Sequence, residues 1–330
     1  MILVTGATGL VGSEVCRMLD KQSIQFIAMK RNQSDISLCE GIDIDWVEGD
    51  VLDIPSLDDA LQNIDTVIHC AAIVSFDKNQ FTEMMDVNVS GTRNIVNCSL
   101  ANNVKDFIHV SSIAALGRSK DVDVITEKTL WIDSPLNTNY AKSKYLSEIE
   151  VWRGESEGLN VSVVNPSVVL ASGDGRRSSS KLLQYIWDEH WFYIDKKLNY
   201  VDVMDVASAI LRLYTDQVWG KRYILSAGAI SYQKIFVDLS DRLNRKIPKI
   251  NVNHQYLRVG TIVSQIWSFI SRRPQVISAE LMKTMKENFI YSGIKICEDL
   301  DFEYTKPENT FDRICSEFLR FKTAEKFLTQ

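Results

Sequence analysis

The sequence predicts an α/β fold, in which a doubly wound parallel sheet is followed by a smaller, mostly helical C-terminal domain. Two observations support this prediction. Short, nearly continuous apolar segments alternate with amphipathic segments through the first half of the chain, as they do where helices cover both faces of a parallel sheet. A glycine-rich turn also joins the first apolar segment to the first amphipathic one. Beyond residue 228 the pattern is mostly helical and less regular.

The alternation can be followed along the chain. Apolar runs predict strands over 2–5, 25–29, 45–47, 66–70, 107–110 and 161–164. Apolar residues at helical spacing predict helices over 10–21, 55–62, 80–102 and 140–158. Segment 199–216 returns to a strand followed by a helix, and 221–227 is again strand-like. Parallel strands joined by helices in this way form the doubly wound architecture.

The composition limits what the protein can do. With 330 residues, 45% of them apolar, the chain can bury a large core. Its net charge of −6 and its scattered basic residues give no reason to expect a nucleic-acid partner. Six cysteines, at 16, 39, 70, 98, 297 and 315, form no CxxC pair, so we expect reduced thiols and no metal site.

The N-terminal residues carry no basic region followed by a long apolar stretch, so we expect a cytoplasmic protein. The longest apolar window, 260–271, is shorter than the roughly 20 residues that a membrane-spanning helix needs. We therefore expect no transmembrane segment. A helix that packs on its own protein is the favoured interpretation, and contact of residues 258–273 with a membrane surface or a lipid-like substrate stays open.

The segment TGATGLVG places Gly6, Gly9 and Gly12 between the first strand and the first helix. Gly6 permits a tight bend, Gly9 lets the main chain approach a pyrophosphate, and Gly12 lets the helix pack closely on the strand. The start of the helix offers N–H groups and a partial positive charge to the phosphates. This context predicts a dinucleotide site, with glycines that serve the turn alone as the alternative.

The end of the second strand indicates which dinucleotide binds. An NAD site usually places Asp or Glu there to bind the ribose 2′-hydroxyl, but this chain has Lys30 and Arg31. Arg can bind a 2′-phosphate through paired, charge-assisted hydrogen bonds. We therefore expect a preference for NADP, while NAD stays open. Solvated loop charges are the alternative interpretation.

The segment YAKSK puts Tyr140 and Lys144 four residues apart, on one face of a predicted helix. A free phenol has a pKa of about 10 and is a poor base at neutral pH. We expect the Lys144 ammonium to lower the pKa of Tyr140, so that the phenol can exchange a proton with a carbonyl or alcohol oxygen. Lys144 could also bind the nicotinamide ribose.

These motifs resemble those of the extended short-chain dehydrogenase/reductase superfamily, which has a Rossmann core. Within it, the chain is most similar to dihydroflavonol reductases, 3β-hydroxysteroid dehydrogenases and their bacterial relatives. The resemblance covers about residues 1–225 and rests on TGATGLVG, VNVSGTRNIVNC, HVSSIAALG, YAKSKYLSE, NPSVVL and YVDVMDVA. We expect a dinucleotide-binding domain of 1–170, to which 199–226 return, and a substrate-binding domain of 171–198 and 227–330. Dimers are common in the superfamily, so a homodimer is expected.

The resemblance also implies roles for single residues. The catalytic hydroxyl, five residues before Gly117, is Ser112, with Ser111 as the second candidate. Its role would be to donate a hydrogen bond to the substrate oxygen. Asn88 would brace the neighbouring strand. The implied cofactor contacts are Gly6, Thr8, Gly9, Leu10, Val11, Gly12, Lys30, Arg31, Asp50, Val51, Ala71, Ala72, Tyr140, Lys144, Pro166 and Val169.

Departures from the superfamily patterns separate its activities. Ile113 and Ala114 stand where sugar 4,6-dehydratases carry Asp-Glu, so dehydration by that route is not expected. Leu198–Asn199 stands where nucleotide-sugar epimerases usually carry Arg-Asp to bind the diphosphate. Asn165 nevertheless matches an Asn that those epimerases use. The balance favours a substrate other than a nucleotide sugar.

We therefore expect an NAD(P)-dependent oxidoreductase that transfers a hydride between the nicotinamide and a carbonyl or alcohol of a small, apolar substrate. The alternatives are a nucleotide-sugar epimerase with tightly bound cofactor and a non-catalytic cofactor sensor. The pocket is expected between the carboxyl edge of the sheet and the C-terminal domain. Its candidate walls, each of which could instead belong to the core, are Phe76, Trp131, Trp187, Trp191, Phe192 and Tyr193.

Overall fold

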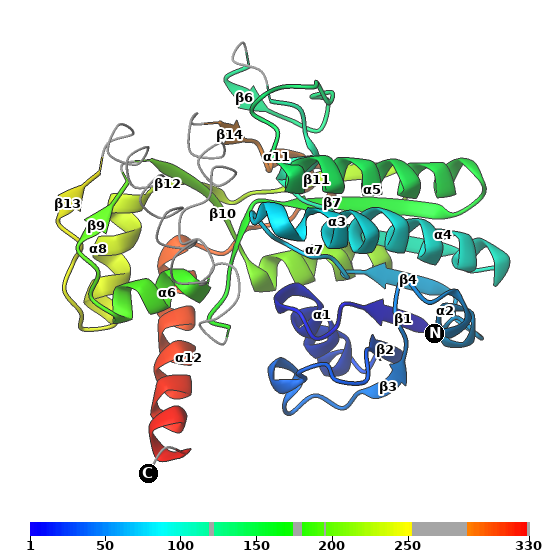
Figure 1. The fold of residues 1–330 in the computed structure, drawn as a ribbon, viewed down its shortest axis with the longest axis horizontal. Coiled ribbons are helices and arrows are strands. Elements are labelled where there is room, and N and C mark those ends of the chain that lie inside the picture. Colours follow the sequence, from blue (N-terminus) through cyan, green and yellow to red (C-terminus); the bar gives the residue numbers. More distant parts are fainter. Residues whose placement is uncertain (119–121, 174–179, 195, 253–288, 329–330) are drawn as a thin grey trace.

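The computed structural model describes residues 1–118, 122–173, 180–194, 196–252 and 289–328. Its centre is a seven-stranded sheet in which all neighbouring strands are parallel. In spatial order the strands are β11 (Lys221–Leu225), β7 (Asn160–Pro166), β5 (Asp106–Val110), β4 (Thr66–His69), β1 (Ile2–Thr5), β2 (Phe26–Lys30) and β3 (Asp45–Glu48) (Figure 1). The order reverses between β1 and β4, and in such sheets ligands bind where this reversal meets the carboxyl ends of the strands.

Helices cover both faces of this sheet. Alternation along β1 sends Ile2 and Val4 into one apolar core and Leu3 into the other. The first core is closed by α1 (Leu10–Lys21), α7 (Val203–Thr215) and α11 (Ile294–Leu300), and the second by α2 (Ile54–Ala60), α4 (Gly91–Ala101) and α5 (Asn139–Ser156). The predicted doubly wound fold is therefore confirmed, and the predicted bounds of β1 and α1 match those observed.

The long helix predicted over 80–102 is present, but it is not α-helical throughout. After a short 3₁₀ turn (Lys78–Gln80), α3 (Phe81–Met85) continues through a π-helical turn (Asp86–Ser90) into α4 without a break. The π turn contains Asn88, whose side chain accepts a hydrogen bond from the Ile73 N–H at 2.7 Å and donates one to the Ile73 carbonyl at 2.9 Å. The expected structural role of Asn88 is confirmed, because this amide braces the chain that follows β4.

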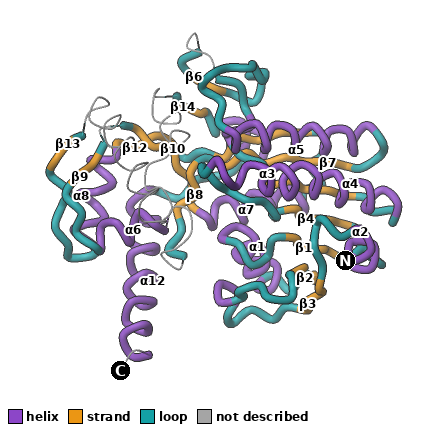
Figure 2. The backbone as a smooth tube through the Cα atoms, viewed as in Figure 1, coloured by secondary structure: helices purple, strands orange, loops and turns teal. Residues whose placement is uncertain are grey.

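A smaller sheet and three helices form a separate region with its own apolar core (Figures 1 and 2). Its strands are β8 (Val168–Leu170), β10 (Lys197–Asp202) and β12 (Gly228–Ser231), and its helices are α6 (Ser180–Trp187), α8 (Tyr232–Arg242) and α12 (Pro307–Leu328). The segment 199–226, expected to return to the main sheet, is divided between the two sheets. Its α7 and β11 pack with the main sheet, but residues 199–202 are part of β10, whose main chain pairs with β8 and β12 in the smaller sheet.

Short elements complete the described chain. They are two 3₁₀ turns (Ser37–Cys39 and Ile113–Ala115), the pair β6 (Val124–Ile125) with β14 (Ile290–Tyr291), and the pair β9 (Phe192–Tyr193) with β13 (Ile250–Asn251). All six cysteines are free thiols. The apolar window 260–271 lies outside the described residues. Every helix within the described ranges is too short or too polar to cross a bilayer.

The turn between β1 and α1 requires glycine at two positions for packing. Gly6 has a φ of +67°, and a Cβ there would lie 2.5 Å from the Ala71 nitrogen. A Cβ on Gly12 would lie 2.2 Å from the Gly6 carbonyl oxygen. In contrast, a Cβ on Gly9 would meet only the Gly6 oxygen, at 3.3 Å. Packing within the protein therefore explains Gly6 and Gly12 but not Gly9.

This difference predicts the stability of two alanine variants. Gly12→Ala should lower the free energy of unfolding by about 2–3 kcal/mol, because the new Cβ would clash with the main chain of Gly6 and Ala7, which is held by the end of β1. Gly9→Ala should lower it by less than about 1 kcal/mol, the scale of a changed helix N-cap. Urea unfolding followed by circular dichroism measures both variants. Equal losses would show that the turn is not packed as described.

Candidate active site

The start of α1 fits the pyrophosphate of a dinucleotide. Gly9 is the N-cap of α1, and no side chain caps this helix end. The N–H groups of the first helical turn have no partners within the helix and carry a partial positive charge. Gly9 has no Cβ, and the space that a Cβ would take has only the Gly6 oxygen near it. A phosphate can therefore approach the main chain closely there.

The other predicted cofactor residues follow the carboxyl ends of neighbouring strands. Lys30 ends β2, and Arg31 is exposed just beyond it, with its N–H donating to the Ser34 hydroxyl at 3.1 Å. Asp50 follows β3, and its carboxylate accepts a hydrogen bond from the Leu52 N–H at 2.9 Å. Val51 follows β3, Ala71 and Ala72 follow β4, and Pro166 is the last residue of β7.

Two of these candidates are placed differently from the rest. Val51 is only 6% exposed and packs against Gly91, where a Cβ would lie 2.6 Å from its side chain. Val169 lies in β8, paired with Val201 in the smaller sheet. Thr8, Leu10 and Val11 lie within the glycine turn and the first turn of α1.

The end of β5 is attached to α5 by residues spaced four apart along the helix. Lys144, only 2% exposed, donates from Nζ to the Val110 carbonyl oxygen at 2.9 Å. The next residue, Ser111, is buried and donates to a Glu148 carboxylate oxygen at 2.7 Å. Its hydroxyl is therefore turned into the core.

Ser112 has the opposite orientation to Ser111. Ser112 is partly exposed, and its hydroxyl accepts a hydrogen bond from the Ala114 N–H at 3.1 Å and interacts with Tyr140. Tyr140 also keeps part of its surface exposed, and its ring meets that of Phe76 edge-on, with the centroids 6.0 Å apart. The structure therefore brings Ser112 rather than Ser111 to the phenol.

The expected effect of Lys144 on Tyr140 is wrong. Burial raises the pKa of Tyr140 above its usual value, and a hydrogen bond with the Ser112 side chain opposes this rise. The reason is geometric, because the Lys144 ammonium is directed to the Val110 carbonyl. Burial lowers the pKa of Lys144 to about 8, opposed by the nearby Glu148 carboxylate. At neutral pH the phenol therefore keeps its proton and Lys144 keeps its charge.

Glu148 is a buried residue of the site that the sequence analysis does not predict. It is 1% exposed and continues the four-residue spacing of Tyr140 and Lys144, which is the signal that could have identified it. Asn165, which matches an Asn that nucleotide-sugar epimerases use, is its neighbour. Here it is fully buried and donates to Glu148 at 3.0 Å and to the Ser112 carbonyl at 2.9 Å.

The aromatic residues expected around the pocket are divided between several places. Phe76 contacts Tyr140, as described above. Trp187 and Tyr193 pack against rings of α12 and α8, so the core alternative holds for these two. Two others are largely exposed, Trp191 at 70% and Phe192 at 52%.

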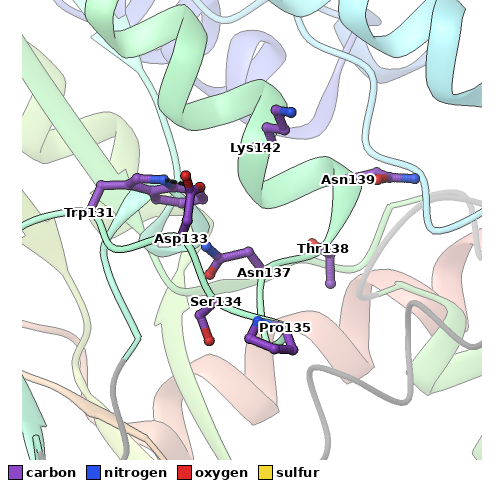
Figure 3. A pocket seen from close by; sticks show the side chains of 8 residues that line it. All are labelled: Trp131, Asp133, Ser134, Pro135, Asn137, Thr138, Asn139 and Lys142. Atoms are coloured by element: carbon purple, nitrogen blue, oxygen red, sulfur yellow. Dashed lines mark hydrogen bonds between the residues drawn. The ribbon is translucent and has the colours of Figure 1, made fainter.

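Trp131 lies in a groove of about 400 Å³ beside the first turn of α5 (Figure 3). Its indole donates to Asp133 at 3.3 Å and stacks on Tyr145, with centroids 4.3 Å apart. The other residues that line the groove are Ser134, Pro135, Asn137, Thr138, Asn139 and Lys142. Tyr140 and Lys144 do not line it, so this groove is separate from the face of α5 that carries them.

Comparisons with known proteins agree with this fold. A model of the NAD dependent epimerase/dehydratase family matches residues 2–225. The chain is 29% identical over 304 residues to a putative dihydroflavonol 4-reductase of Synechocystis sp., covering 90% of this chain and 88% of that protein. It is 28% identical over 254 residues to sterol demethylase protein B of Methylococcus capsulatus, covering 76% of each.

A solved structure gives the same fold at lower identity. The UDP-glucose 4-epimerase of Thermotoga maritima, solved with UDP-glucose, is similar with a TM-score of 0.79 and 18% identity, over 98% of this chain and 99% of that one. At this identity the likeness shows the fold alone. The family match covers most of the chain, and the resemblance to extended short-chain dehydrogenases/reductases is confirmed. The protein is therefore an NAD(P)-dependent oxidoreductase that belongs to the NAD dependent epimerase/dehydratase family.

Proposed function

We propose that the protein is an NADP-preferring reductase that acts on the carbonyl group of a small, apolar, ring-bearing substrate. The observation that carries this proposal is the grouping of a protonated Tyr140 phenol, the Ser112 hydroxyl and the buried Lys144 ammonium at the end of β5. A relative named as a putative dihydroflavonol 4-reductase supports the substrate class. The main sheet and its helices would hold the cofactor, with the smaller sheet and its helices on the substrate side.

The residues that would hold the cofactor follow from their positions. Main-chain N–H groups in the first turn of α1 would bind the pyrophosphate. The exposed Arg31 guanidinium would bind a 2′-phosphate. Residues after β3 and β4, namely Asp50, Val51, Ala71 and Ala72, would line the adenosine and ribose portions. When bound, the nicotinamide supplies a hydride to the carbonyl carbon or takes one from the alcohol.

The protein side chains would handle the oxygen of the substrate. Because burial raises the pKa of Tyr140, the phenol carries a proton at neutral pH and can donate it to the oxygen of a carbonyl as charge develops there. The Ser112 hydroxyl would donate a second hydrogen bond to the same oxygen. The Lys144 ammonium, held beside the end of β5 by the Val110 carbonyl, would bind the nicotinamide ribose.

Epimerisation of a nucleotide sugar is the alternative function. It is supported by the match to a family that includes epimerases. The position of Asn199 argues against it. Its amide donates to the Phe289 carbonyl at 2.8 Å and accepts from the Tyr291 N–H at 3.0 Å. This side chain is therefore occupied by the main chain near β14 and offers no positive charge to a diphosphate.

Net consumption of NADPH tests the proposed reaction. We expect the protein to oxidise NADPH in proportion to product when supplied with a panel of aromatic and alicyclic ketones. Tyr140→Phe should lower kcat by a factor of about 100 or more, with the Kd for NADPH nearly unchanged, because only the proton donor is removed. Interconversion of UDP-sugars without net cofactor change would instead support an epimerase. Full activity of the Phe variant would remove Tyr140 from the mechanism.

Cofactor preference tests the role of Arg31. Arg31→Ala should raise the KM for NADPH about tenfold, since one charge-assisted hydrogen-bonding group is lost. The KM for NADH serves as the internal control and should stay the same, because NADH has no 2′-phosphate. A wild-type preference for NADH, or equal changes with both cofactors, would contradict the assignment.

The pH dependence of reduction tests the role of Lys144. Its pKa is lowered to about 8, so the ammonium is present below that pH and is lost as the pH rises through it. We expect kcat for ketone reduction to fall above about pH 8 for this reason. Lys144→Met, which has no charge at any pH, should be slow throughout and lack this decline. A decline that persists in the Met variant would come from another group.

A further inference from the structure

Glu148 is a buried carboxylate whose oxygens are all engaged. One oxygen accepts hydrogen bonds from the Ser111 hydroxyl at 2.7 Å and from the Asn165 amide at 3.0 Å. The other accepts from the Trp152 indole at 3.3 Å and forms an ion pair with Arg222. A carboxylate that is 1% exposed is costly to keep charged unless it is fully partnered in this way.

Asn165 connects this carboxylate to the main chain of Ser112. The two hydrogens of its amide nitrogen serve two acceptors, the Glu148 carboxylate and the Ser112 carbonyl at 2.9 Å. Rotating the amide would bring its oxygen against these two acceptors, so the orientation is determined. The Asn165 oxygen itself has no partner among the described residues.

Arg222 is the ion-pair partner of Glu148. It reaches the carboxylate from β11, the edge strand paired with β7, and its guanidinium lies 5.8 Å from the centroid of the Trp152 ring. The Arg222 side chain is 25% exposed, whereas that of Glu148 is 2% exposed. Arg222 is therefore the member of the ion pair nearer the surface, and Glu148 is the buried member, which accepts the hydrogen bond from Asn165.

The position of the Ser112 hydroxyl depends on this arrangement. Ser112 has an extended backbone, with φ −162° and ψ 154°, and follows the last residue pair of β5 and β7 by two residues. Its carbonyl is held by Asn165 and its hydroxyl faces Tyr140. A shift of about 1 Å in a catalytic group can cost roughly 100-fold in rate.

We propose that Glu148 is a positioning residue for the reaction, which acts through Asn165 to fix the main chain of Ser112 and so the place of its hydroxyl. This inference rests on the proposed function, because it assumes that Ser112 acts on the substrate oxygen. Glu148 touches neither substrate nor cofactor. Its effect on rate should therefore disappear when the Ser112 hydroxyl is absent.

A double-mutant cycle of Glu148→Gln and Ser112→Ala tests this coupling in the ketone-reduction assay. Glu148→Gln should lower kcat about tenfold, with the KM for NADPH changed less than about twofold. In the Ser112→Ala background the same substitution should lower kcat by less than about twofold, because coupled residues are not additive. Additive effects would overturn the proposal, since a general loss of structure acts equally in both backgrounds.

Glu150→Gln is the matched control. It makes the same chemical change on the same helix, at a residue whose carboxylate pairs with Arg93 and Arg153 near the surface. It should leave kcat unchanged, and a tenfold loss there would overturn the link to Ser112. If Glu148→Gln does not fold, Asn165→Ser replaces it in the cycle, because it removes the bridge but keeps the ion pair of Glu148 with Arg222.

The cycle also separates this inference from the proposed function. If Ser112→Ala retains full activity, the role proposed for Ser112 fails. If Ser112→Ala is slow and the effects of Glu148→Gln are additive, the role of Ser112 stands and only the positioning role of Glu148 fails.

Discussion

The docking of α5 against the end of β5 is the interaction on which the rest of the site depends. Tyr140, Lys144 and Glu148 form one stripe along the helix, and three consecutive positions at the strand end meet it. The buried Lys144 ammonium needs an acceptor, and the Val110 carbonyl supplies one at 2.9 Å. Once this bond fixes the register, Ser111 is turned toward Glu148 and Ser112 toward Tyr140. The chemistry of the phenol is thus set by main-chain geometry as much as by charge.

The glycine turn lies at the same edge of the sheet, and it leads into α1, which covers the face opposite to that of α5. Gly6 and Gly12 bring α1 against β1 and the chain after β4, and the open space at Gly9 leaves the helix start accessible. Because all seven strands are parallel, the carboxyl ends of β1 and β5 lie on one edge. A helix start suited to phosphates and a buried proton donor are therefore placed together by topology. The smaller sheet and its helices stand beside this edge (Figure 1).

Local patterns were sufficient for much of this arrangement. Alternating apolar segments and the glycine spacing predicted the sheet and the bounds of α1, and four-residue spacing paired Tyr140 with Lys144. Long-range contacts were not predictable. The four-residue spacing places Glu148 on the helix face of Tyr140 and Lys144, but it does not show which partners the carboxylate has, and one of them, Arg222, is far along the chain. The pKa of Tyr140 was misjudged for the same reason, since a shared helix face does not reveal that the ammonium is bound elsewhere.

The central claim is that the glycine turn and the α5 stripe serve one reaction centre. A crystal structure of the protein with NADPH tests it most directly. The account predicts that the pyrophosphate lies at the start of α1 and that the nicotinamide ring lies beside Tyr140 and Ser112, with Lys144 still at the end of β5. A nicotinamide ring bound away from the Tyr140 phenol, with the pyrophosphate at the glycine turn, would contradict the account.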